Sequence, residues 1–111
     1  MNINKETQEK IQVLQVLEQN LQSLLLQKQA FQVELNEAES AISEIGKSKD
    51  DIYKITGQIM LKADKMNIEK ELGERKDILS IRLKSIDKQE NLLKEKLEKL
   101  KEEVTKEIKK D

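Results

Sequence analysis

The sequence contains no cysteine, histidine, proline or tryptophan, and its 111 residues include one phenylalanine and one tyrosine. Without cysteine the chain has neither disulfides nor thiol chemistry, which fits a reducing cytosol and gives the expectation of a cytoplasmic protein. Without histidine it lacks the most common general base and metal ligand. With two aromatic residues, a compact globule of this size would be short of bulky core side chains. The composition therefore argues against an ordinary globular domain.

Further absences exclude other classes of protein. No run of about 18 apolar residues exists, so we expect no membrane span, and residues 1–7 lack the apolar core of a signal peptide. The 21 basic and 22 acidic residues nearly balance, which argues against a nucleic-acid-binding arm. The adjacent Asp50 and Asp51 would point to opposite faces of a strand, so they do not form a metal site. We expect no enzyme, no metal and no cofactor.

A charged fraction of 39% suits long helices with charged outer faces and a narrow apolar seam. In residues 5–45, steps of three and four connect ten seam positions, of which Lys28 alone is polar. They are Leu14, Leu17, Leu21, Leu24, Lys28, Phe31, Leu35, Ala38, Ile42 and Ile45. This heptad pattern predicts a coiled-coil helix with Asn4 as N-cap and Gly46 just past its end. Lys28 either sets the register or extends its ammonium group to water.

The same spacing predicts a second helix over residues 67–109, with Asn67 as its N-cap. Its apolar positions, with Arg75 and Glu90 as polar members of the seam, are Ile68, Leu72, Leu79, Leu83, Ile86, Leu93, Leu97, Leu100, Val104 and Ile108. Five apolar residues lie off the seam of the first helix and indicate contact with something other than the partner helix: Val13, Val16, Leu25, Leu26 and Val33. The second helix has three off its seam, Ile78, Ile81 and Leu92, of which the first two lie near the hairpin.

Residues 51–62, between the helices, predict a β-hairpin, because two apolar runs flank a break at Thr56-Gly57. Gly57 supplies the positive φ of a tight turn. A turn centred there would pair Tyr53 with Met60. The apolar candidates for assembly are Ile52, Tyr53, Ile55, Ile59, Met60 and Leu61. A lone hairpin is marginal in water, so we interpret it as an element completed by strands of other chains; the alternative is a short connector.

We expect one domain over residues 1–111, in which the hairpin returns the chain and the helices pair antiparallel. The two termini then meet, and Phe31 lies near Leu83. The apolar residues that gather at this tip are candidates for contact with a ligand: Ile11, Val13, Leu14, Leu97, Leu100, Val104 and Ile108. Without further information, the favoured interpretation of the tip is a solvated helix end with i,i+4 ion pairs, and the alternative is a fraying end that transiently exposes apolar residues.

The whole layout resembles the β-class subunits of prefoldin, a co-chaperone of archaea and eukaryotes. The segment Ile52-Tyr-Lys-Ile-Thr-Gly-Gln-Ile-Met-Leu-Lys62 is the sharpest local match, and the stretch from Arg82 to Leu92 is also similar to the family. A single hairpin implies the β class, because α-class subunits carry two.

The resemblance implies a hetero-hexamer of two α-class and four β-class subunits whose hairpins form an intersubunit β-barrel, with Ile78 and Ile81 packed under it. It implies an ATP-independent co-chaperone whose coiled-coil tips bind unfolded polypeptides and deliver them to a group II chaperonin. A rival hypothesis is a homo-oligomeric coiled-coil scaffold or tether without chaperone activity, for which the hairpin is only a turn.

Overall fold

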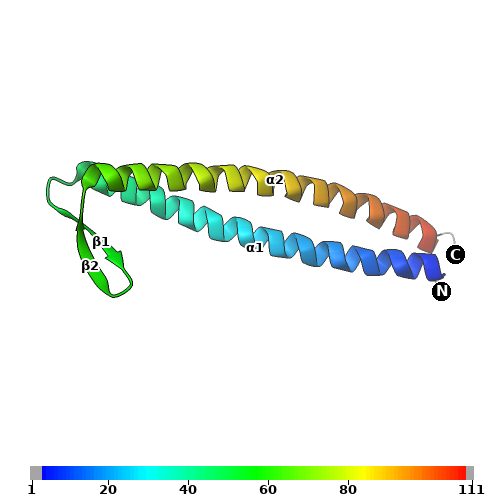
Figure 1. The fold of residues 1–111 in the computed structure, drawn as a ribbon. Helices are drawn as coiled ribbons and strands as arrows, with labels where there is room; N and C mark the ends of the chain where they lie inside the picture. The colour runs from blue at the N-terminus through cyan, green and yellow to red at the C-terminus, as the bar shows by residue number, and fades with distance from the viewer. Residues whose placement is uncertain (1–3, 110–111) are drawn as a thin grey trace. The chain divides into compact units, whose positions relative to one another are not determined.

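The computed structural model describes residues 4–109, which form two long helices and a hairpin of two strands (Figure 1). The elements in chain order are α1 (Lys5–Lys47), β1 (Ile52–Thr56), β2 (Ile59–Ala63) and α2 (Lys65–Lys109). The predicted fold class, a mostly α chain with a short antiparallel hairpin between two helices, is confirmed. Neither helix contains, within the described residues, an apolar stretch long enough to cross a membrane.

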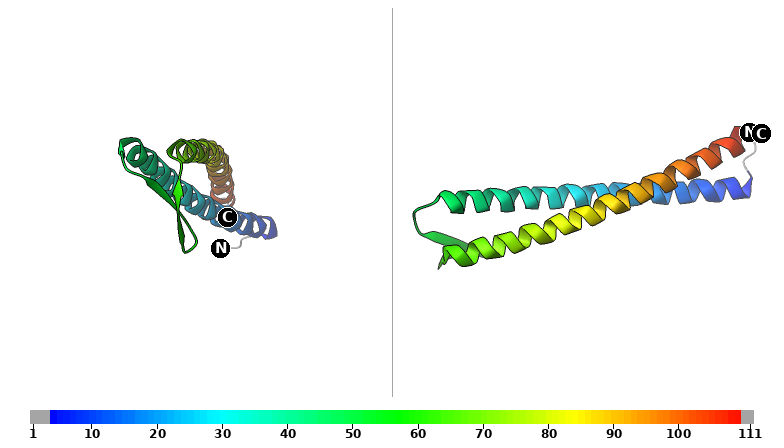
Figure 2. Two further views of the ribbon diagram at one scale, coloured as in Figure 1. Left: turned by 60° about the vertical axis from the view of Figure 1, so that its left-hand side comes forward. Right: turned by 90° about the horizontal axis from the view of Figure 1, so that it is seen from above.

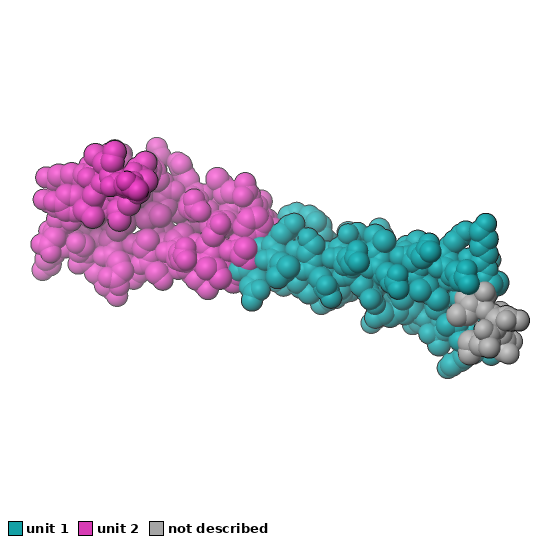
Figure 3. Space-filling view, turned by 90° about the horizontal axis from the view of Figure 1, so that it is seen from below, with its two compact units in different colours: residues 1–29, 84–111 teal, residues 30–83 magenta. Residues whose placement is uncertain are grey.

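The chain divides into two compact units, which Figure 3 shows in different colours. Residues 1–29 and 84–111 make the end unit, which combines the beginning of α1 with the end of α2. Residues 30–83 make the hairpin unit, which holds the rest of both helices and the two strands. Each unit has its own part of the seam.

The helix termini follow local capping chemistry. The backbone N–H of Thr7 donates to the Asn4 side-chain oxygen at 2.7 Å, which confirms Asn4 as the N-cap of α1. The prediction for α2 was wrong: the helix begins at Lys65, and the Asp64 carbonyl accepts the N–H of Ile68 at 3.0 Å. Asp64, itself a favoured N-cap residue, therefore takes the place predicted for Asn67. Gly46 is not past the end of α1, which continues to Lys47.

In the end unit the two helix segments run antiparallel beside each other (Figure 2). The buried apolar side chains of this unit are Leu24, Ile86, Leu97 and Val104. Lys28 interrupts the seam and pairs across the helices, 2.9 Å from Asp87 and 3.3 Å from Glu90, which is 8% exposed. The hydrogen bonds to Asp87 and Glu90 raise the pKa of Lys28. Of the two interpretations of Lys28, the structure therefore favours the one in which it fixes the helix register.

In the hairpin unit the seam continues with buried Ala38, Leu79 and Leu83. The Arg82 guanidinium lies 5.6 Å from the centroid of the Phe31 ring, a cation–π distance. This contact agrees with the predicted antiparallel alignment of Phe31 and Leu83. Arg75 and Glu34 form a second cross-helix contact, with 3.3 Å between guanidinium nitrogen and carboxylate oxygen.

The strands pair antiparallel, but the turn lies one residue later than predicted, so each cross-strand partner shifts by two residues. Thr56 stands opposite Ile59, Ile55 opposite Met60 and Tyr53 opposite Lys62, so the pairing of Tyr53 with Met60 was wrong. The turn is Gly57-Gln58, with Gly57 at φ +62°, and the predicted positive φ is confirmed. Thr56 is β-branched and stays in β1, which moves the loop one residue along the chain.

Candidate functional site

The hairpin is the first candidate site, because its apolar side chains have no core of their own. Ile55 and Met60, which face each other across the strands, are 68% and 63% exposed. Strand alternation puts Tyr53, Ile55 and Met60 on one face and Ile52, Ile59 and Leu61 on the other. Of the predicted set, Ile52 is half-buried, and Tyr53, Ile59 and Leu61 are exposed like Ile55 and Met60.

An ion pair joins the hairpin to α2. The Lys54 ammonium lies 3.3 Å from the Glu71 carboxylate. Beside this contact is an open hollow of about 560 Å³, also lined by Arg75, Ile78 and Arg82. Ile78, like Ile81 on the next turn, is exposed. The face of the hairpin unit near the strands thus offers apolar and charged groups to another molecule.

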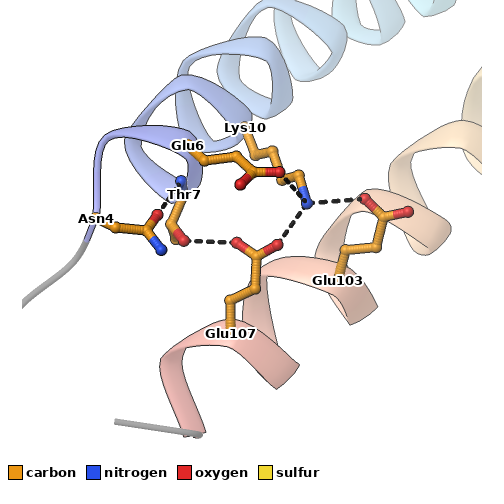
Figure 4. Close-up of polar contacts among 6 residues, drawn as sticks. All are labelled: Asn4, Glu6, Thr7, Lys10, Glu103 and Glu107. Atoms are coloured by element: carbon orange, nitrogen blue, oxygen red, sulfur yellow. Dashed lines mark hydrogen bonds and ion pairs between the residues drawn. The ribbon is translucent and has the colours of Figure 1, made fainter.

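The second candidate site is the end unit, where Figure 4 shows a polar cluster that we call the clasp. Thr7 is 3% exposed, and its hydroxyl donates to the Glu107 carboxylate at 2.5 Å. The Lys10 ammonium also bonds Glu107 and lies 3.6 Å from Glu103 and 3.8 Å from Glu6. The clasp therefore ties the first turns of α1 to the last turns of α2.

All seven predicted tip residues lie in the end unit, but the structure does not expose them equally. Val13 is 52% exposed, whereas Leu97 is 5% and Val104 is 7% exposed in the seam. The other four, which are half-buried, are Ile11, Leu14, Leu100 and Ile108. A client could reach Leu97 or Val104 after the helices separate, while Val13 and the adjacent exposed Val16 are accessible as they stand.

The clasp was not predicted. The predicted seam of α1 begins at Leu14, and no role was predicted for Thr7, Lys10 or Glu107. The sequence does hold a signal for the α1 half of the clasp. The steps of four and three residues continue back from Leu14 to Lys10 and then to Thr7. The partners on α2 could not be chosen from sequence, since lysine and glutamate alternate throughout that segment.

The clasp should hold the helix ends together in a pH-dependent way. The hydrogen bond to Glu107, with attraction from Glu103 and Glu6, raises the pKa of Lys10 above its ordinary value in spite of desolvation. Because the pKa of Lys10 is raised in the folded state, its ion pairs contribute their full stability below the ordinary lysine pKa, about 10.4. This contribution is lost as the pH rises through the raised pKa.

We expect Lys10→Met to speed amide hydrogen exchange in residues 101–107 by roughly two- to fivefold at neutral pH. In the unmodified chain we expect the protection of these amides to fall as the pH rises through the raised pKa of Lys10, and the variant should lack this fall. Lys5→Met, which changes an exposed lysine in the same first turns, is the control and should leave both unchanged. Equal exchange in the two variants would contradict a holding role for the clasp.

Comparison with known proteins agrees with this architecture. The family described as "Prefoldin subunit" matches residues 8–111. The prefoldin subunit beta of Pyrobaculum calidifontis is 44% identical over 90 residues, covering 79% of this chain and 72% of that protein. That of Methanothrix thermoacetophila is 39% identical over 101 residues, covering 89% and 84%. The crystal structure of the prefoldin beta subunit from Thermococcus strain KS-1 superposes with a TM-score of 0.86 at 34% identity, covering 95% and 94%.

Proposed function

This chain belongs to the prefoldin family of chaperones as a β-type subunit, and we propose that it works as an ATP-independent holdase in a hetero-hexamer with α-class subunits. In this proposal, four copies join two α-class subunits. The complex binds non-native polypeptides and transfers them to a group II chaperonin. The family is not one of enzymes, and the chain would act through binding surfaces alone.

The observation that carries the proposal is the exposed hairpin. An isolated two-stranded sheet leaves backbone donors and acceptors open along both outer edges and is marginal on its own. Here both faces also expose apolar side chains, Ile55 and Met60 on one and Ile59 and Leu61 on the other. Strands from neighbouring subunits would satisfy the edges and close a β-barrel, which buries one face. The hollow beside Lys54 and Ile78 would receive a neighbouring subunit at the same time.

Client binding is proposed at the end units of several subunits together. Each end unit exposes small apolar groups such as Val13 and Val16, with an open hollow of about 440 Å³ beside them. One such patch binds weakly, but several patches on one complex raise the effective concentration for a single unfolded chain. Opening of the clasp would add the half-buried Leu100 and Ile108 to this surface.

The test is to isolate the complex that this chain forms in its own cells, and to measure its native mass and its effect on an unfolded protein. A mass of four copies plus two longer coiled-coil subunits, with aggregation of the unfolded protein suppressed equally with and without ATP, is expected. A homodimer or a lone monomer without effect on aggregation would contradict the proposal and favour a scaffold or tether.

A further inference from the structure

The exposed side of α1 is nearly free of charge in the part of the end unit that follows Lys10. Of residues 11–29, six are glutamines and two are ionisable, Glu18 and Lys28. Both ionisable groups are paired with α2: Glu18 lies 3.7 Å from Lys101, and Lys28 contacts Asp87 and Glu90. We define the amide face as nine exposed uncharged side chains of this segment: Gln12, Val13, Gln15, Val16, Gln19, Gln22, Leu25, Leu26 and Gln29.

The lack of charge is specific to α1. Across the same unit, residues 84–109 of α2 contain fifteen charged side chains, by count from the sequence. α2 therefore provides the charged surface that keeps the unit in water, and nothing in the overall composition requires α1 to lack it. Depletion of charge distinguishes the centres of protein interfaces from the remaining surface. The contrast between the two helices thus indicates that the amide face contacts another polypeptide.

One part of the amide face has the form of a small binding site. Gln22, Leu25, Leu26 and Gln29 are spaced three, four and seven residues apart, so they share one side of α1 and line an open hollow of about 290 Å³. Leu26 is 67% exposed there. Within residues 4–109, the side-chain amides of Gln22 and Gln29 make no hydrogen bond. Each amide therefore offers two donor hydrogens and an acceptor oxygen beside an apolar floor.

The spacing of the exposed apolar residues distinguishes between two kinds of occupant, a helix and an extended segment. A helix of a second copy would need an apolar stripe that recurs every three or four residues over several turns. Val16 and Leu25 are nine residues apart, which at 3.6 residues per turn rotates them by about half a turn. The exposed apolar groups consequently form separate hollows, one beside Val13 and one beside Leu26. Short extended segments fit such hollows, because their apolar side chains enter while their backbone groups meet the glutamine amides.

We propose that the amide face binds extended segments of non-native polypeptide through backbone hydrogen bonds and apolar contacts, without regard to the charge of the client. This inference rests on the proposed holdase function and adds to it a surface that, apart from Val13, lies outside the predicted tip set. Glutamine amides bond to any peptide backbone, whatever its sequence. A carboxylate or an ammonium in their place would attract clients of one charge and repel those of the other.

The experiment uses the assembled complex and three labelled peptides of equal length and apolar content, one neutral, one acidic and one basic. In one variant, Gln22→Glu is combined with Leu26→Ser. The matched control carries Gln89→Glu with Leu92→Ser, which are the same changes at exposed positions of α2. The unmodified complex should bind the three peptides alike. The α1 variant should bind the neutral peptide about tenfold more weakly and prefer the basic peptide to the acidic one, while the control behaves as the unmodified complex.

The outcomes separate the two proposals. If the unmodified complex retains no unfolded protein, the holdase function itself fails. If it retains unfolded protein, but the α1 variant binds each of the three peptides as well as the α2 control does, the amide face is not the client surface. A change in native mass of the α1 variant alone would show that the face contacts another subunit, which would also overturn the inference.

Discussion

A chain that carries Ile55→Lys and Met60→Glu is expected to keep its hairpin and to lose its assembly. The two residues stand directly opposite each other in the observed register, so the new side chains form a cross-strand pair of opposite charge. Such pairs stabilise an antiparallel ladder, and both positions are exposed in the isolated chain. We therefore expect the change to have little effect on the stability of the isolated subunit.

The proposed intersubunit β-barrel, which we call the platform, should respond differently, because it would bury this face of the hairpin. Removing a carboxylate and an ammonium from water costs on the order of several kcal/mol per ion, and their mutual attraction repays this only in favourable geometry. The cost recurs in every copy of the subunit. We expect the native mass to fall from that of the hexamer to that of separate subunits.

The control for this experiment makes the same pair of changes in the end unit, Val13→Lys with Val16→Glu. These valines are exposed to a similar extent as the hairpin residues but lie outside the proposed platform. The control complex should keep its full mass. A hairpin variant that also assembles fully would show that this face of the hairpin stays outside the interface.

The register used in this design was not available from the sequence. The apolar pattern identified both strands and Gly57 correctly, because β-branched residues around a glycine leave few alternatives. It did not distinguish a Thr56-Gly57 turn from a Gly57-Gln58 turn, since both preserve apolar residues on both faces. Backbone geometry decides between them: Gly57, at positive φ, takes the first of the two loop positions, which leaves Thr56 in β1.

The helices were easier to predict than the sites that they carry. Heptad spacing places every seam residue of α1 in a buried or half-buried position, because periodicity alone determines which side faces the partner. The same spacing made Leu97 and Val104 seam residues, yet their place near a chain end suggested exposure. Whether a helix end is open depends on long-range contacts such as those of Thr7 and Lys10 with Glu107, and these cannot be derived from local pattern.

Two variants of the end unit separate its stability from client binding. Leu97→Ala removes a side chain that is 5% exposed, and we expect it to destabilise the local helix pair by about 2–5 kcal/mol. Hydrogen exchange in residues 93–104 of the assembled complex should then be at least roughly tenfold faster. Val13→Ser with Val16→Ser changes exposed residues and should leave exchange within a fewfold of the unmodified protein.

The two variants should differ in their effect on an unfolded client. If clients bind the surface of the closed end unit, the double valine variant holds them less well, whereas Leu97→Ala keeps binding because Val13 and Val16 are intact. If clients instead bind an opened end, Leu97→Ala increases the open population and binding rises with the exchange rate, because a ligand draws on the population of the state it prefers. The buried position of Leu97 and the contacts of the clasp favour the closed surface. A rise in client binding by Leu97→Ala would therefore assign the binding site to the separated helices.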